Sequence, residues 1–109
     1  MPIANCIFAP HCPEGQGDII ELWSVYAGKS SDEMTVNMIA SNKQAGKQYS
    51  VVASLYLPSI WSEEDINALQ TGLARALAEY WRVDSAAVLV MVHILASGRV
   101  VESGETLVW

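Results

Sequence analysis

The chain has few of the features that support several common functions. Only six of its 109 residues are Lys or Arg, against twelve Asp and Glu, and the formal net charge is −6. Binding to nucleic acid or to an anionic membrane surface needs clustered basic side chains, so this charge balance argues against both partners. No apolar stretch approaches the roughly 18 residues of a membrane span, and no basic region followed by an apolar run predicts a signal peptide.

Cysteine and cofactor motifs are also scarce. Cys6 and Cys12 are too few for a disulfide framework and suit a reducing compartment, which predicts a cytoplasmic protein. The glycine patterns of nucleotide sites are absent. His11, Cys12 and His93 lack the spacing of a three- or four-ligand metal site, and Cys12 has no assured partner base. We therefore expect neither a metal nor an organic cofactor.

Apolar residues, in contrast, are abundant in the chain. Hydrophobic residues make up 51% of the sequence, charged residues only 17%, and four residues are Trp. A monomer of this size has difficulty burying so much apolar area, so we expect burial between subunits. No linker or low-complexity segment divides the chain, which predicts a single domain over residues 1–109.

Hydrophobic periodicity predicts two similar halves followed by a short tail. The expected elements are a strand at 3–9, a helix at 18–27 and a strand at 34–40, then a strand at 49–57, a helix at 62–81, a strand at 88–95 and a small hairpin at 98–109. Right-handed crossovers would put both helices on one face of a four-stranded mixed sheet. The predicted fold is therefore an α/β (α+β) two-layer sandwich of βαββαβ order. Its uncovered sheet face would be buried by self-association.

Cap residues support the two helices. Asp18 can cap the first helix, and Gly28 can end it. Ser62 can cap the second helix, whose first turn holds three acidic residues, Glu63, Glu64 and Asp65. We interpret these carboxylates as a solvated helix end, and the tryptophans as core and interface residues.

Pro2 is the main candidate for a catalytic residue. A methionine followed by proline is normally removed, which would turn the Pro2 nitrogen into a free secondary amine. An α-amine has a pKa of about 8, and an apolar or cationic surrounding lowers it, so the amine can serve as a general base. Lys29, after the first helix, and Arg99, in the terminal loop, would suit an anionic keto or enol acid. The alternatives are a Met-Pro start without function and two ordinary surface cations.

Several segments resemble the tautomerase superfamily, which includes macrophage migration inhibitory factor and 4-oxalocrotonate tautomerase. The start Pro2-Ile3-Ala4 is similar to that of the short tautomerases, and Ala27-Gly28-Lys29 resembles the end of the first helix in the migration inhibitory factor group. Residues 54–88 are similar to the same group, and residues 88–105 to the terminal hairpin of the short tautomerases.

This resemblance implies a homotrimer with sites between subunits and a cofactor-independent keto–enol isomerase acting on a small anionic molecule. Pro2 would be the base, and Lys29 the counterpart of the family's active-site lysine. Together with Arg99, it would hold the carboxylate of a keto or enol acid. The apolar pocket would be lined by Leu89, Met91 and Trp109.

The chain also departs from the family pattern. Leu89 and Met91 stand where the migration inhibitory factor group has an aromatic and an amide, and Leu89 and Cys12 where the short tautomerases have arginines. Pro58 stands where the family can offer a backbone N–H, which proline lacks. The alternative hypothesis is therefore a catalytically silent trimer that binds a partner or a small ligand.

Overall fold

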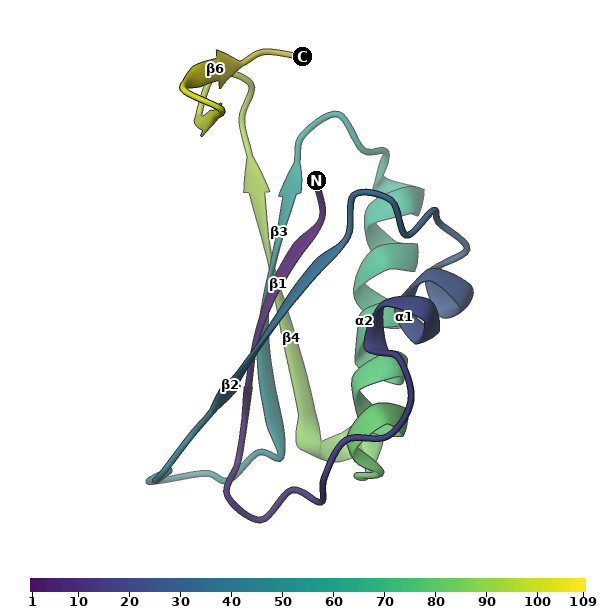
Figure 1. Ribbon diagram of the computed structural model, residues 1–109, viewed down its shortest axis with the longest axis vertical. Coiled ribbons are helices and arrows are strands. Elements are labelled where there is room, and N and C mark those ends of the chain that lie inside the picture. Colours follow the sequence, from purple (N-terminus) through teal and green to yellow (C-terminus); the bar gives the residue numbers. More distant parts are fainter.

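The computed structural model describes residues 1–109 as two helices, a four-stranded sheet and a small hairpin (Figure 1). The elements are β1 (Ile3–Phe8), α1 (Ile19–Ala27), β2 (Thr35–Ala40), β3 (Val51–Pro58), α2 (Glu63–Trp81), a 3₁₀ turn (Ser85–Ala87), β4 (Val88–Leu95), β5 (Val100–Glu102) and β6 (Glu105–Leu107). This order confirms the predicted βαββαβ arrangement. Neither helix is long and apolar enough to cross a membrane.

The sheet is mixed, with strand order β2-β1-β3-β4. Strands β1 and β2 are parallel, β3 and β4 are parallel, and the central pair β1 and β3 is antiparallel. Each half of the chain is therefore one βαβ unit, and the two units join through their first strands. Strands β5 and β6 form a separate antiparallel hairpin, at the same end of the molecule as the amino terminus (Figure 1).

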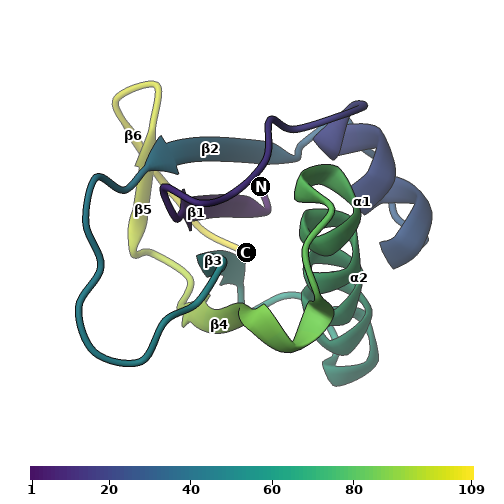
Figure 2. The same ribbon diagram turned by 90° about the horizontal axis from the view of Figure 1, so that it is seen from below.

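Both helices cover one face of the sheet and leave the other face free of helices (Figure 2). The core lies between these two layers. Its largest fully buried side chains are Trp23, Leu55, Leu57, Leu69, Leu73, Leu77, Val51 and Cys6. The two helices approach closely at Gly72, where an added Cβ would lie 2.7 Å from the backbone nitrogen of Ala27.

The predicted helix ends are confirmed. The Asp18 carboxylate accepts backbone N–H bonds from Ile20 and Glu21 at the start of α1, and Gly28 ends the helix in the left-handed conformation, with φ of 66°. The Ser62 hydroxyl accepts the N–H of Asp65 at the start of α2. The caps at Gly28 and Ser62 fix the two helix ends that border the site described below.

Strand β3 differs slightly from its predicted range of 49–57. It begins at Val51 and extends to Pro58. The N–H of Tyr49 is bonded to the side-chain carbonyl of Gln44, at 2.6 Å, and this bond keeps Tyr49 in the preceding loop.

The face without helices carries rows of paired side chains. Alternation along β1 turns Ala4 and Cys6 toward the helices, so Ile3, Asn5 and Ile7 point the other way. One cross-strand row is wholly apolar and consists of Ile39, Ile7, Val52 and Leu89. The next row contains the hydrogen-bonded pair Asn37 and Asn5, and a further row contains the stacked rings of Tyr56 and His93. This surface fits the predicted self-association.

Candidate active site

A small pocket of about 140 Å³ opens where β1 begins, and it contains both Pro2 and Lys29. Its lining residues are Met1, Pro2, Lys29, Ser30, Glu33 and Trp61. They come from three places in the chain, namely the start of β1, the loop after α1 and the loop between β3 and α2. The fold thus brings together two of the residues that the sequence singled out.

Pro2 is buried, and the first strand holds it in place. Its carbonyl accepts the N–H of Thr35 at 3.0 Å, which extends the pairing of β1 and β2 by one bond. Met1 lies in the same pocket, and its ammonium group is 3.9 Å from a carboxylate oxygen of Glu33. Pro2 is therefore a buried residue that lines a pocket rather than one on open surface.

Lys29 is positioned by the end of α1 and by two neighbouring side chains. These are Trp61, in the loop before α2, and Asp65, in the first turn of α2. Its carbonyl accepts a hydrogen bond from the Ser24 hydroxyl. Its ammonium group forms an ion pair with Asp65 and lies 5.8 Å from the centre of the Trp61 ring. The Lys29 and Asp65 side chains are only 25% and 34% exposed, so water screens this pair less than a fully exposed one.

Asp65 has a role that the sequence analysis missed. The hydrogen bond from Lys29, and next the one with Ser62, hold the pKa of the Asp65 carboxyl below its usual value. The interpretation of the first turn of α2 as solvated fits the exposed Glu63 and Glu64 but not Asp65. No local signal reveals this pair, because its two residues are 36 positions apart.

The tryptophans divide into two groups. Trp23 and Trp81 are buried in the core as predicted, and the indole N–H of Trp23 donates to the carbonyl of Leu69 at 3.0 Å. Trp61 instead lines the Pro2 pocket. Its indole Nε1 is the only buried side-chain nitrogen or oxygen in the chain without a hydrogen-bond partner. Such groups are rare in folded proteins, and an unpaired one at a pocket is a candidate ligand contact.

The other predicted site residues do not lie at this pocket within one chain. Leu89 and Met91 are on β4, on the face without helices. Strand β3 separates them from β1, at whose start the pocket lies. Arg99 is exposed in the turn before β5. The main-chain nitrogen of Trp109 donates to Ser97, and its indole N–H donates to Ser59 at 2.9 Å, close to the start of α2.

His11 and Cys12 lie beyond the opposite end of β1, where both contact Ser50, and Cys6 is buried in the core. Burial raises the pKa of the Cys6 thiol to about 12 and also raises that of Cys12, so both favour the unreactive protonated form. His11 contacts the Ser50 hydroxyl at 3.1 Å and not Cys12. Pro58, the other departure noted above, is buried at the end of β3. No three His, Cys, Asp or Glu side chains are grouped so that they could hold a metal ion.

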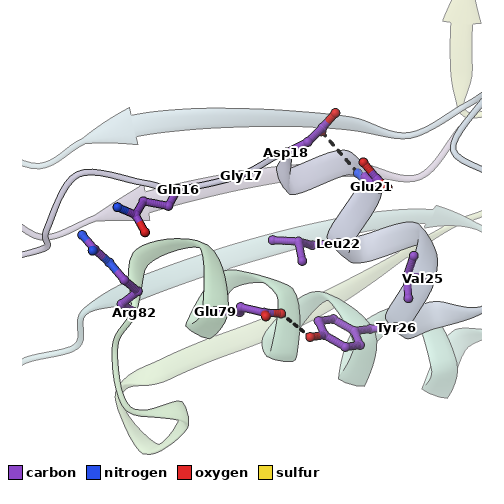
Figure 3. A pocket seen from close by; sticks show the side chains of 9 residues that line it. All are labelled: Gln16, Gly17, Asp18, Glu21, Leu22, Val25, Tyr26, Glu79 and Arg82. Carbon is purple, nitrogen blue, oxygen red and sulfur yellow. Dashed lines mark hydrogen bonds between the residues drawn. The ribbon is translucent and has the colours of Figure 1, made fainter.

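The largest pocket, of about 570 Å³, is elsewhere and lies between the start of α1 and the end of α2 (Figure 3). Three of its side chains are acidic, and one of these, Glu79, accepts the hydroxyl hydrogen of Tyr26. This bond raises the pKa of Tyr26. The pocket contains neither Pro2 nor Lys29, and two of its side chains, Tyr26 and Glu79, already pair with each other, so we do not assign the active site to it.

The Pro2 pocket therefore combines three chemical groups. They are the nitrogen of a residue that becomes an amine if Met1 is removed, a lysine already paired with a carboxylate, and a tryptophan whose buried indole N–H has no partner. The sequence analysis identified Pro2 and Lys29, whereas it read Trp61 and Asp65 only as structural residues. An amine base beside a neutral hydrogen-bond donor is suited to moving a proton at a carbon next to a carbonyl.

Comparisons with known proteins identify the fold. No protein-family model and no curated protein matches the sequence. Among solved structures, a symmetric trimer of wild-type fused 4-OT matches with a TM-score of 0.75 at 11% identity, over 96% of this chain and 94% of that one. Macrophage migration inhibitory factor from Oncomelania hupensis matches with a TM-score of 0.71 at 12% identity, over 98% of this chain and 82% of that one. A member of the cis-3-chloroacrylic acid dehalogenase family matches with a TM-score of 0.72 at 12% identity, over 96% and 82%. The chain thus has the tautomerase-superfamily fold that its sequence resemblance predicted.

Proposed function

We propose that the chain is a cofactor-independent keto–enol tautomerase in which the Pro2 nitrogen, freed by removal of Met1, is the general base. The observation that carries this proposal is the burial of Pro2 in one pocket with Lys29 and Trp61. Burial disfavours the charged form of an amine, so it lowers the pKa of the Pro2 nitrogen toward neutrality. The tautomerase fold of the chain agrees with this chemistry.

The reaction needs one proton to leave the substrate and one to return. The neutral Pro2 amine takes the proton from the enol hydroxyl, or from the carbon next to the carbonyl in the reverse direction. The resulting enolate carries its charge largely on oxygen, where a hydrogen-bond donor stabilises it. The Pro2 ammonium then returns the proton to the other atom, so base and substrate end with the same number of protons as before.

We also propose that the chain works as a homotrimer. The sheet face without helices exposes apolar side chains that association would bury, and similar structures include trimers of fused 4-OT. The sequence resemblance implies sites between subunits, and we propose that in such a trimer Leu89, Met91, Arg99 and Trp109 reach the Pro2 pocket of a neighbouring subunit. Both cysteines are free, which agrees with our proposal of a cytoplasmic location.

The kinetic test compares the wild type with Pro2→Ala in the conversion of the enol of a phenylpyruvate-like compound to its keto form. Loss of the secondary amine should lower kcat/KM about 10²- to 10⁴-fold, the usual contribution of a general base. Pro10→Ala replaces an exposed proline outside the pocket and should keep the wild-type rate. Equal rates in wild type and Pro2→Ala would remove Pro2 from the mechanism.

A catalytically silent trimer is the second candidate, because Leu89 and Met91 are apolar and Lys29 is already paired with Asp65. It predicts that a reagent selective for amines of low pKa does not prefer Pro2. Rapid, selective labelling of Pro2 would instead support the enzyme.

A further inference from the structure

We propose that the Pro2 pocket is selective for an uncharged keto or enol compound over a carboxylic acid, with Asp65 cancelling the charge of Lys29 and the Trp61 N–H binding the carbonyl oxygen. This inference rests on the proposed function and specifies its substrate class. It replaces the anionic substrate expected from the sequence, which depended on a free Lys29.

The charges around the pocket disfavour a negatively charged substrate. The Met1 ammonium group leaves with Met1, so Lys29 is then the only cationic side chain among the lining residues, Glu33 is an anion, and Asp65 is bound directly to Lys29. Pro2 must be neutral to act as a base, so it adds no positive charge in the active form. One positive charge from the chain itself, or two where Arg99 of the partner subunit reaches the pocket, then stands against two negative ones. A substrate carboxylate would lose its hydration without meeting a net positive potential.

Asp65 is fixed in this position by the fold. The Ser62 hydroxyl accepts the Asp65 N–H at 3.1 Å, so the start of α2 holds the backbone of Asp65. The turn that ends α1 holds Lys29 through backbone hydrogen bonds from Gly28 and Lys29 to the carbonyl of Ser24. The Trp61 ring lies beside the ammonium group and favours the position in which Asp65 accepts its hydrogen bond.

Trp61 supplies a hydrogen-bond donor for the carbonyl oxygen of the substrate. Its indole N–H is buried and unpaired, and the residue lines a pocket that is largely apolar apart from the paired charges. An indole can only donate a hydrogen bond, and a carbonyl or enolate oxygen is an acceptor. Because Met1 lines the same pocket, its removal vacates space next to Pro2 and Trp61. A neutral carbonyl compound satisfies the N–H without bringing a second negative charge.

The test uses a matched pair of substrates, phenylpyruvate and its uncharged methyl ester, with the full chain. The wild type should have a kcat/KM for the ester at least about tenfold above that for the acid, the scale of one unit charge at a partly exposed site. Asp65→Asn should lower this ester-to-acid ratio about tenfold by freeing Lys29. Glu63→Gln, in the same helix turn but outside the pocket, should keep the wild-type ratio. A wild-type preference for the acid, or an unchanged ratio in Asp65→Asn, would overturn the inference.

Trp61→Phe tests the hydrogen bond separately, because it keeps an aromatic ring beside Lys29 and removes the N–H together with part of the indole ring. We expect kcat/KM for the ester to fall about tenfold, mainly through kcat. Unchanged kinetics would show that the indole N–H does not bind the carbonyl oxygen.

Binding distinguishes a failure of this inference from a failure of the proposed function. If the wild type converts neither substrate, the tautomerase proposal fails, and the unreactive pair methyl phenylacetate and phenylacetate then tests the pocket alone. A shift of the Trp61 indole N–H resonance on adding the ester, and a smaller one with the acid, would support the inference without any turnover. A larger shift with the acid, or no shift with either, would overturn it.

Discussion

At the residue scale, the Pro2 pocket depends on contacts between side chains that are far apart in the sequence. Pro2 and Lys29 could be selected from the sequence because a Met-Pro start and a lysine after a helix-ending glycine are local patterns. Asp65 and Trp61 could not, because a capping residue and a loop tryptophan have the same local pattern whether or not they meet a lysine. Tertiary packing alone assigns them to the site.

The Lys29–Asp65 pair predicts how stability depends on pH. The pKa of Asp65 is lowered in the folded chain, chiefly by the hydrogen bond from Lys29. Its carboxylate therefore stabilises the fold above the unfolded-state pKa of about 4, and this contribution is lost as the pH falls through the lower folded-state pKa. We expect Asp65→Asn to be less stable than the wild type at pH 7 and to approach it as the pH falls below about 4.

Urea unfolding of both proteins at pH 7 and at pH 3 measures this difference in free energy. Glu63→Gln is the control, since it removes a charge from the same helix turn without breaking an ion pair. A deficit of Asp65→Asn that is as large at pH 3 as at pH 7 would contradict the assignment.

At the scale of elements, hydrophobic periodicity and caps predicted the order and nearly all the boundaries of the helices and strands. These signals are local, and the structure confirms them. The exception at the start of β3 has a side-chain cause, the bond from Tyr49 to Gln44. The sequence did not predict how closely α1 and α2 approach, because a glycine within a helix, such as Gly72, does not by itself indicate a close contact with another helix.

Gly72 supports a direct prediction about this helix contact. Alanine normally favours a helix by about 1 kcal/mol over glycine. At this position, however, its Cβ would lie 2.7 and 2.8 Å from backbone atoms of Ala27, so the helices would have to separate. We expect Gly72→Ala to lower the free energy of unfolding by about 1–3 kcal/mol, measured by urea denaturation.

The control for this prediction is Thr71→Ala, at the neighbouring exposed position on α2, which should change stability by less than about 1 kcal/mol. If Gly72→Ala proved more stable than the wild type, the helices would not be in contact there as described.

At the scale of the whole molecule, the predicted two-layer sandwich and its uncovered sheet face are both present (Figure 2). The sequence predicted this face because two βαβ units with right-handed crossovers leave one side of the sheet without helices. It could not predict the cross-strand rows, since they depend on register. The row containing Ile7 and Ile39 is apolar, and these two side chains are 42% and 46% exposed in one chain.

Self-association through this face is tested by Ile7→Asp, which would bury a carboxylate in the proposed interface. We expect its mass in light scattering to fall from that of a trimer to that of a monomer. Val25→Asp places the same charge on an apolar residue of α1 that is 68% exposed and faces away from the sheet interface, and it should stay trimeric. A trimeric Ile7→Asp would place the interface elsewhere.

The central claim is that Pro2 presents a free amine in the pocket it shares with Lys29, and titration of its nitrogen tests this most directly. Protein labelled with ¹⁵N-proline would be followed by NMR as a function of pH. The account predicts that one proline nitrogen titrates as a secondary amine, with a pKa below the reference value of about 8, because the residue is buried. Proline nitrogens that all behave as amides, with no response to pH, would contradict the account.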